Sequence, residues 1–170
     1  MTRKLLLTLL VLVILIPVMV LLAGQYLFHW EPLVRFGIGG AQAVEQSADE
    51  AARVVEEFYR WYRAYPGNAF AERAYRESPL LAPAFIQELD AEIEAMNAAG
   101  PGGADPILCA QDIPGEMRYG VAEVDGKTAT AVVQQVWNPG TEFESIRELT
   151  VELQQSDAEW LIGDITCPVP

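Results

Sequence analysis

The sequence predicts an α+β domain behind an N-terminal transmembrane helix. Residues 5–24 form an uncharged apolar run, and residues 47–97 place apolar side chains at helical spacing. Residues 116–166 instead alternate apolar and polar side chains, with turn signals between the runs. Helices followed by antiparallel strands are typical of α+β domains, in which the helices cover one face of a twisted sheet. We therefore expect two or three helices packed on a curved antiparallel sheet of about four strands.

The apolar run at residues 5–24 is long enough to cross a bilayer. At about 1.5 Å per residue, a helix of this length extends roughly 30 Å, which matches the hydrocarbon core. Arg3 and Lys4 precede the run, and aromatic residues follow it. Basic residues stay on the cytoplasmic side, so the sequence predicts a cytoplasmic N-terminus. A cleaved signal peptide is the alternative, although the run is longer than the usual apolar region of such peptides.

Three regions follow from this interpretation. We predict a transmembrane signal anchor over residues 1–24, a juxtamembrane stalk over 25–46 and an extracytoplasmic domain over 47–170. The protein is then a single-pass protein of the cell membrane, and the lipid bilayer is its partner through residues 5–24. The stalk has no clear period, and its glycines favour a tether or a segment in the membrane interface.

The helical half begins at Ser47, because Ser47-Ala48-Asp49-Glu50 matches a capping box. The helix ends before Pro66-Gly67, and residues 68–76 are compatible with a second, short helix. A third helix is predicted from Pro83 to about Asn97. Each long helix has an apolar stripe, formed by Ala51, Val54, Val55, Phe58, Tyr62 and Tyr65 in the first and by Phe85, Ile86, Leu89, Ile93 and Met96 in the last.

The second half reads as a meander of strands. Runs at 116–124 and 128–137 flank Asp125-Gly126, a strong hairpin signal. Residues 146–155 alternate between apolar and polar side chains, and a last strand is predicted over 160–166.

Cys109 and Cys167 are the only cysteines. Both lie in the region placed outside the membrane, where disulfides form and persist, so we predict a bond between them. Their spacing fits no zinc motif, and a catalytic cysteine would need a base that the domain does not offer. The sequence predicts no metal and no cofactor.

Three stretches, Phe58–Tyr62, Asp105–Pro114 and Trp160–Ile165, carry a resemblance to a known family. Together they resemble the bacterial family of domains of unknown function numbered 3828 (DUF3828), over roughly residues 51–167. The resemblance implies an exported or lipid-anchored domain with the cystatin-like α+β cone of nuclear transport factor and its relatives. It brings no catalytic residues. Gln25 stands where lipoprotein members carry cysteine, which favours a spanning helix over a lipid anchor.

Composition excludes several classes of function. The chain has a net charge of −13, which disfavours nucleic acid as a partner because phosphate binding needs a positive face. The sequence contains no P-loop, no HExxH and no serine–histidine–aspartate set outside the membrane region. We therefore expect a non-enzymatic binding or interaction domain.

Two groups of residues are candidates for a site. Tyr62, Tyr119, Trp137 and Trp160 would line a ligand pocket in the cone, although each also suits the core. Asp112 and Asp164 would meet if the disulfide forms, and two close carboxylates can make an acid/base pair in a weak enzyme. Simple structural roles are the alternative for both aspartates. A further alternative is an accessory single-span subunit, whose partner would be another envelope or membrane protein, or a second copy in a homodimer.

Overall fold

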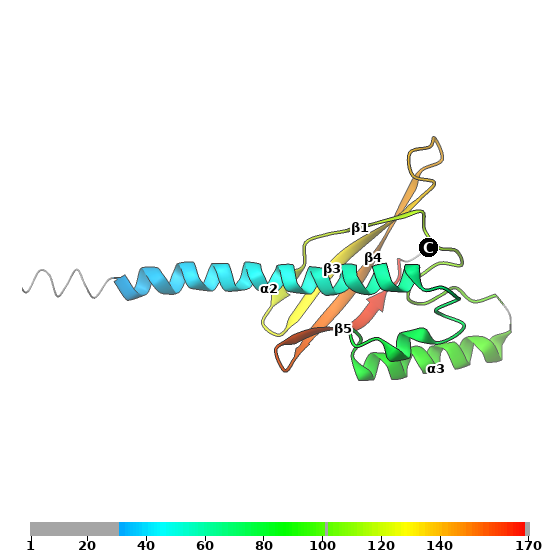
Figure 1. The fold of residues 1–170 in the computed structure, drawn as a ribbon, viewed down its shortest axis with the longest axis horizontal. Helices are drawn as coiled ribbons and strands as arrows, with labels where there is room; N and C mark the ends of the chain where they lie inside the picture. The colour runs from blue at the N-terminus through cyan, green and yellow to red at the C-terminus, as the bar shows by residue number, and fades with distance from the viewer. Residues whose placement is uncertain (1–30, 101, 169–170) are drawn as a thin grey trace, which may run out of the picture. The chain divides into compact units, whose positions relative to one another are not determined.

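The computed structural model describes residues 31–100 and 102–168, and it confirms the α+β class. The chain divides into two compact units, Met1–Ala43 and Val44–Pro170. The second unit holds helices packed on a five-stranded antiparallel sheet (Figure 1). The predicted membrane segment at 5–24 lies outside the described residues. Within the described residues, no helix combines the length and the apolar character that a membrane span needs.

The first described helix, α2, runs from Glu31 to Ala64 and is longer than predicted. The predicted start at Ser47 is wrong, because residues 31–46 are already helical. A capping box acts only where backbone amides lack partners, and amides in a helix interior bond to the preceding turn. The glycines before Ser47 disfavour a helix by only about 1 kcal/mol each, whereas proline would interrupt it. The predicted end before Pro66 is confirmed, and Glu56 and Arg60, one turn apart on α2, form an ion pair.

The sheet has the order β1-β3-β4-β5, and β2 also pairs with β3. The predicted strand over 116–124 is therefore split into two short strands along the same partner. A hydrogen bond from the Gly120 amide to the Val132 carbonyl (2.9 Å) joins the gap. A β-carbon at Gly120 would lie only 3.1 Å from that carbonyl oxygen, so glycine suits this close approach. The strands are β1 (Glu116–Tyr119), β2 (Glu123–Asp125), β3 (Thr128–Trp137), β4 (Ser145–Ser156) and β5 (Glu159–Thr166).

Helix α3 runs from Pro83 to Ala99, as predicted within two residues. The short helix expected over 68–76 is replaced by turns and a 3₁₀ helix, η1, over Ala74–Glu77. The edge of β5 is partly covered by the chain entering α3. There the Ala82 amide donates to the Ile162 carbonyl (2.8 Å), and the Ile162 amide donates to the Leu80 carbonyl (2.9 Å). This coverage protects an edge strand from further pairing.

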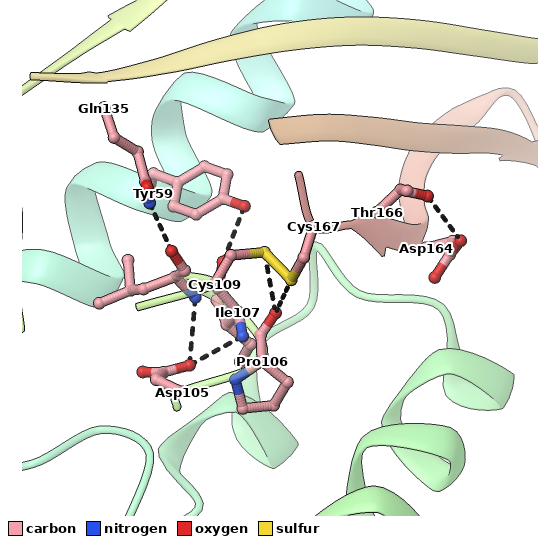
Figure 2. The surroundings of a disulfide bond; sticks show 10 residues. Tyr59, Asp105, Pro106, Ile107, Cys109, Gln135, Asp164, Thr166 and Cys167 are labelled. Atoms are coloured by element: carbon pink, nitrogen blue, oxygen red, sulfur yellow. Dashed lines mark hydrogen bonds between the residues drawn. A yellow bond between two sulfur atoms is a disulfide. The ribbon is translucent and has the colours of Figure 1, made fainter. Parts of the chain in front are cut away.

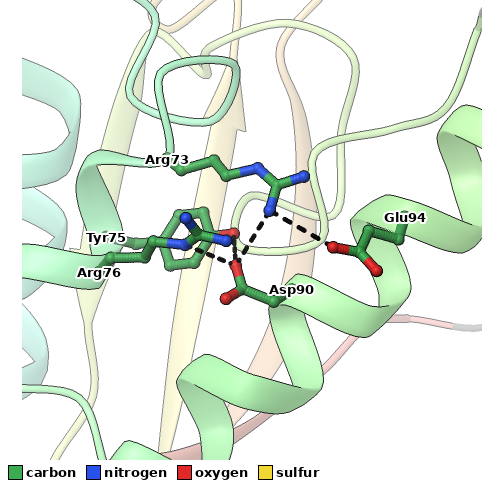
Figure 3. Close-up of polar contacts among 5 residues, drawn as sticks. All are labelled: Arg73, Tyr75, Arg76, Asp90 and Glu94. Atoms are coloured by element: carbon green, nitrogen blue, oxygen red, sulfur yellow. Dashed lines mark hydrogen bonds and ion pairs between the residues drawn. The ribbon is translucent and has the colours of Figure 1, made fainter.

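A charged cluster fixes η1 to α3 around Asp90 (Figure 3). Asp90 Oδ1 accepts a hydrogen bond from the Tyr75 hydroxyl (2.6 Å) and another from Arg76 Nε (2.9 Å). Arg73 bridges Asp90 and Glu94 at 3.6 and 3.9 Å. The Arg76 bond holds the pKa of Asp90 below its ordinary value, and burial raises the pKa of Tyr75 to about 12. Tyr75 therefore stays a hydrogen-bond donor at neutral pH.

One hydrophobic core lies between the helices and one face of the sheet. Phe58 and Tyr59 of α2 are fully buried, as are Val133 and Val151 on the inner sheet face. No described helix covers the outer face, where Val132 is 40% exposed. The predicted stripes supply most helical core residues, but Tyr59 lies outside the first stripe and is nevertheless fully buried.

Candidate functional site

The candidate site includes the loop at residues 105–115. Asp105 stabilises this loop through hydrogen bonds to its backbone. Asp105 Oδ1 accepts hydrogen bonds from the backbone amides of Ile107 (2.8 Å) and Leu108 (3.1 Å), as Figure 2 shows in part. Its other oxygen accepts a bond from the Tyr62 hydroxyl (2.8 Å). Asp105 also pairs with Ala110 through its backbone amide (2.9 Å). One short side chain thus closes the loop and attaches it to α2.

Buried side chains from α2 and β3 hold the loop from two other directions. The Tyr59 hydroxyl donates to the Ile107 carbonyl (3.1 Å), and Gln135 Nε2 donates to the Leu108 carbonyl (2.5 Å; Figure 2). Gln135 is 1% exposed although it lies within a strand. These bonds satisfy carbonyl groups that would otherwise be buried without partners.

The predicted disulfide between Cys109 and Cys167 is confirmed, with the two Cα atoms 5.4 Å apart. It joins the loop to the chain just after β5 (Figure 2). Cys109 adopts a positive φ of 50°, a conformation that side chains other than glycine rarely take. The loop is therefore held covalently as well as by hydrogen bonds.

Arg63 fastens the far end of the loop. Its Nη2 donates to the carbonyls of Pro114 and Gly115, both at 3.2 Å. Its Nε is buried and has no hydrogen-bond partner within the described residues. Tyr59, Tyr62 and Arg63 thus form one polar edge of α2 that holds the loop along its length.

A cavity of about 310 Å³ lies beside this loop, at the C-terminal end of α2. Asn68 Oδ1 accepts a bond from the Ala71 amide (2.9 Å), and Glu72 accepts one from the Asn68 amide (3.1 Å). Both bonds order the turn after α2, which also lines the cavity. The cavity combines aromatic, acidic and basic side chains, namely Tyr62, Tyr65, Phe70, Asp105, Asp112 and Arg63.

Burial determines the electrostatics of the cavity wall. It raises the pKa of Asp105, although the bonds from Tyr62 and the two amides oppose this effect. Burial, together with the charge of Asp105, raises the pKa of the Tyr62 hydroxyl well above its ordinary value. At neutral pH the tyrosine is therefore a donor to the aspartate.

The structure brings only two of the predicted site residues together, because Tyr62 and Asp112 line the same cavity. Asp164 is not among the residues that line it, and its Oδ2 accepts a hydrogen bond from the Thr166 hydroxyl (3.5 Å). Tyr119 borders a separate hollow of about 360 Å³, and Trp160 borders one of about 480 Å³. Trp137 packs against the core. The four aromatic residues therefore do not share one pocket.

The most important site residue, Asp105, was not among the predicted ones. It begins the Asp105–Pro114 stretch on which the family resemblance partly rests, and Asp-Pro is a known turn signal. That signal indicates a turn at Asp105. It does not indicate that Tyr62, 43 residues earlier, binds the same carboxylate.

Comparison with solved structures finds two similar chains, and the first of them shares the fold. A protein of unknown function from Bacteroides thetaiotaomicron is similar with a TM-score of 0.53 and 23% identity, over 78% of this chain and 98% of that chain. A chain in the type VI effector–immunity complex Tae3–Tai3 from Ralstonia pickettii has 22% identity and a TM-score of 0.48, over 71% of this chain and 97% of that chain. No family model and no curated protein matches the chain.

Proposed function

We propose that the protein is a non-enzymatic binding domain, held on the outer side of the cell membrane by residues 5–24, with its ligand site in the cavity beside Asp105. The observation that carries this proposal is a cavity of about 310 Å³ whose wall is fastened before any ligand arrives. Small-molecule sites are usually preformed cavities of this order, with a few placed polar groups. We also propose that the chain belongs to the DUF3828 family and shares its cystatin-like cone. The Asp105–Pro114 stretch carries part of that resemblance and also forms part of the cavity wall.

The lining favours a small ligand that carries an ammonium group. Tyr62, Tyr65 and Phe70 offer aromatic surfaces, and Asp112 at the exposed rim offers a carboxylate. A cation beside an aromatic ring gains about 0.5–2 kcal/mol, and a charged hydrogen bond to a carboxylate adds to this. Arg63 keeps its charge, but its Nη2 is directed at two loop carbonyls.

Binding fits the lining better than catalysis does. Asp105 accepts three hydrogen bonds that hold the loop, so its oxygens are occupied by structural partners. A general acid or base needs a proton that it can exchange with substrate.

Titration of the full-length protein in detergent with small primary amines, and with the matched alcohols, tests the proposal. NMR amide shifts of Gly67 and Gln111 on the cavity wall should change saturably with an amine and stay unchanged with its alcohol. Asp112→Asn should weaken the binding about tenfold, since it removes one charged contact. Asp125→Asn, an equal charge change on the exposed strand β2, serves as the control. Absence of amine binding, or equal weakening by both variants, would refute the proposal.

A further inference from the structure

The connection between β3 and β4, residues 138–144, is a loop with several internal hydrogen bonds that extends from the end of the sheet (Figure 1). The Thr141 amide and hydroxyl both donate to the Asn138 carbonyl, at 3.2 and 2.9 Å. The amides of Gly140, Phe143 and Glu144 donate to Glu144 Oε2 (2.7 Å), Thr141 Oγ1 (3.2 Å) and the Thr141 carbonyl (3.2 Å). Positive φ angles at Asn138 (49°) and Gly140 (76°) complete the turn. The loop therefore has a defined conformation without contacts to a partner.

This ordered loop presents an aromatic ring to water. Phe143 is 72% exposed, and its backbone carbonyl accepts a bond from Asn138 Nδ2 (3.4 Å). Ile146, the second residue of β4, is 47% exposed and pairs with Val136 on the outer sheet face. An aromatic ring that is mostly exposed to water contributes little to folding, because hydrophobic stabilisation comes only with burial.

The charge around the ring is acidic. Glu142 precedes Phe143 and is exposed, and Glu148 lies on the same sheet face as Ile146 and is also exposed. The base nearest in sequence, Arg147, is directed to the other face because successive strand residues alternate. Arg118 of β1 forms an ion pair with Glu116. Glu142 and Glu148 thus place negative charge beside the exposed side chains of Phe143 and Ile146, and we call these two glutamates the acidic rim.

We propose that residues 138–146 are a docking element that inserts Phe143 into an apolar pocket rimmed by lysine or arginine on another protein. Aromatic residues dominate the hot spots of protein interfaces, and a loop ordered in advance loses less conformational entropy on binding. The acidic rim selects a basic partner surface and speeds the encounter. This element does not depend on the Asp105 cavity, so either proposal can fail alone.

Site-specific photocrosslinking in the native host cells tests the inference. Full-length protein carrying benzoylphenylalanine in place of Phe143 should give one dominant crosslinked protein, whose crosslinked peptide lies in an apolar pocket beside lysine or arginine. The same probe at Glu88, exposed on α3, should not give that product. In titrations with the purified partner, Phe143→Ala should weaken binding at least tenfold, and Phe143→Leu should restore most of the affinity.

Three outcomes would overturn the inference. They are the absence of any crosslink from position 143, an equal product from position 88, and a crosslink to a second copy of this chain, which would indicate self-association instead. Phe143→Ala should leave the thermal midpoint unchanged, because the ring is exposed. This measurement separates loss of binding from loss of folding.

Discussion

Replacement of Asp105 by alanine tests whether this one carboxylate holds the cavity wall. The substitution removes three hydrogen bonds and leaves the amides of Ile107 and Leu108 without their acceptor. Both residues are at least 96% buried, so water cannot readily replace the carboxylate. Each buried amide left unpaired costs about 1–3 kcal/mol. Relief of the desolvated carboxylate offsets part of the loss, and we expect a net destabilisation of about 3 kcal/mol.

Asp105→Asn is the matched control. Its Oδ1 can still accept from both amides, and only the Tyr62 bond must rearrange, so we expect a loss of about 1 kcal/mol or less. The two variants thus separate the amide bonds from the bond to Tyr62.

Urea unfolding of the full-length protein in detergent, monitored by tryptophan fluorescence, measures both effects. Because burial raises the folded-state pKa of Asp105, the native state binds more protons than the unfolded chain at pH values between the two pKa values. This contribution to stability therefore decreases as pH rises from about 4 through the folded pKa. The decrease should disappear in Asp105→Asn. An Asp105→Ala variant within about 0.5 kcal/mol of the native protein would refute the proposed role, since such changes are typical of sites without these features.

Three further perturbations have expected outcomes. Ala158 has a φ of 71° in the β4–β5 turn, so Ala158→Gly should raise the free energy of unfolding by about 1 kcal/mol. Gly126 has a φ of 61°, so Gly126→Ala should lower it by a similar amount. Thermal unfolding measures both changes. The lowered pKa of Asp90 stabilises the fold above the unfolded-state pKa, and this stability is lost as pH falls through the folded-state pKa. Asp90→Asn should therefore reduce the loss of stability at acid pH, measured by urea unfolding at several pH values. An unchanged loss in this variant would exclude the Asp90 cluster as the cause. Replacing Cys109 and Cys167 with serine should cost about 4 kcal/mol, and equal urea midpoints with and without the bond would contradict this value.

Local patterns predicted most of the secondary structure. The alternation over 128–137 coincides with β3, and the apolar spacing after Pro83 gives α3. The disulfide was also predictable, because only two cysteines were present and both lay in the region assigned to an oxidising space. The strand and the helix were predicted from patterns within their own segments, and the disulfide from the compartment assigned to the domain.

The start of α2 and the site could not be predicted in the same way. The capping-box pattern at Ser47 is compatible with a helix interior, and only the helical state of the preceding turn decides between the two. Gln135 occupies an apolar position in β3 because it bonds to the Leu108 carbonyl, which comes from a segment 27 residues away. Bonds of this kind depend on the packed arrangement and leave no periodic signal in the sequence.

The bonds to residues 105–115 explain why this irregular segment can form the wall of a cavity. A loop without internal strands or helices normally retains conformational freedom, and a ligand must then offset the entropy of ordering it. Here α2 supplies Tyr62 and Arg63, β3 supplies Gln135, and Cys167 just after β5 supplies the disulfide, so three separate parts of the chain fix the loop. The conformational entropy of the loop is therefore lost on folding, and a ligand of the cavity would bind to a wall that is already ordered.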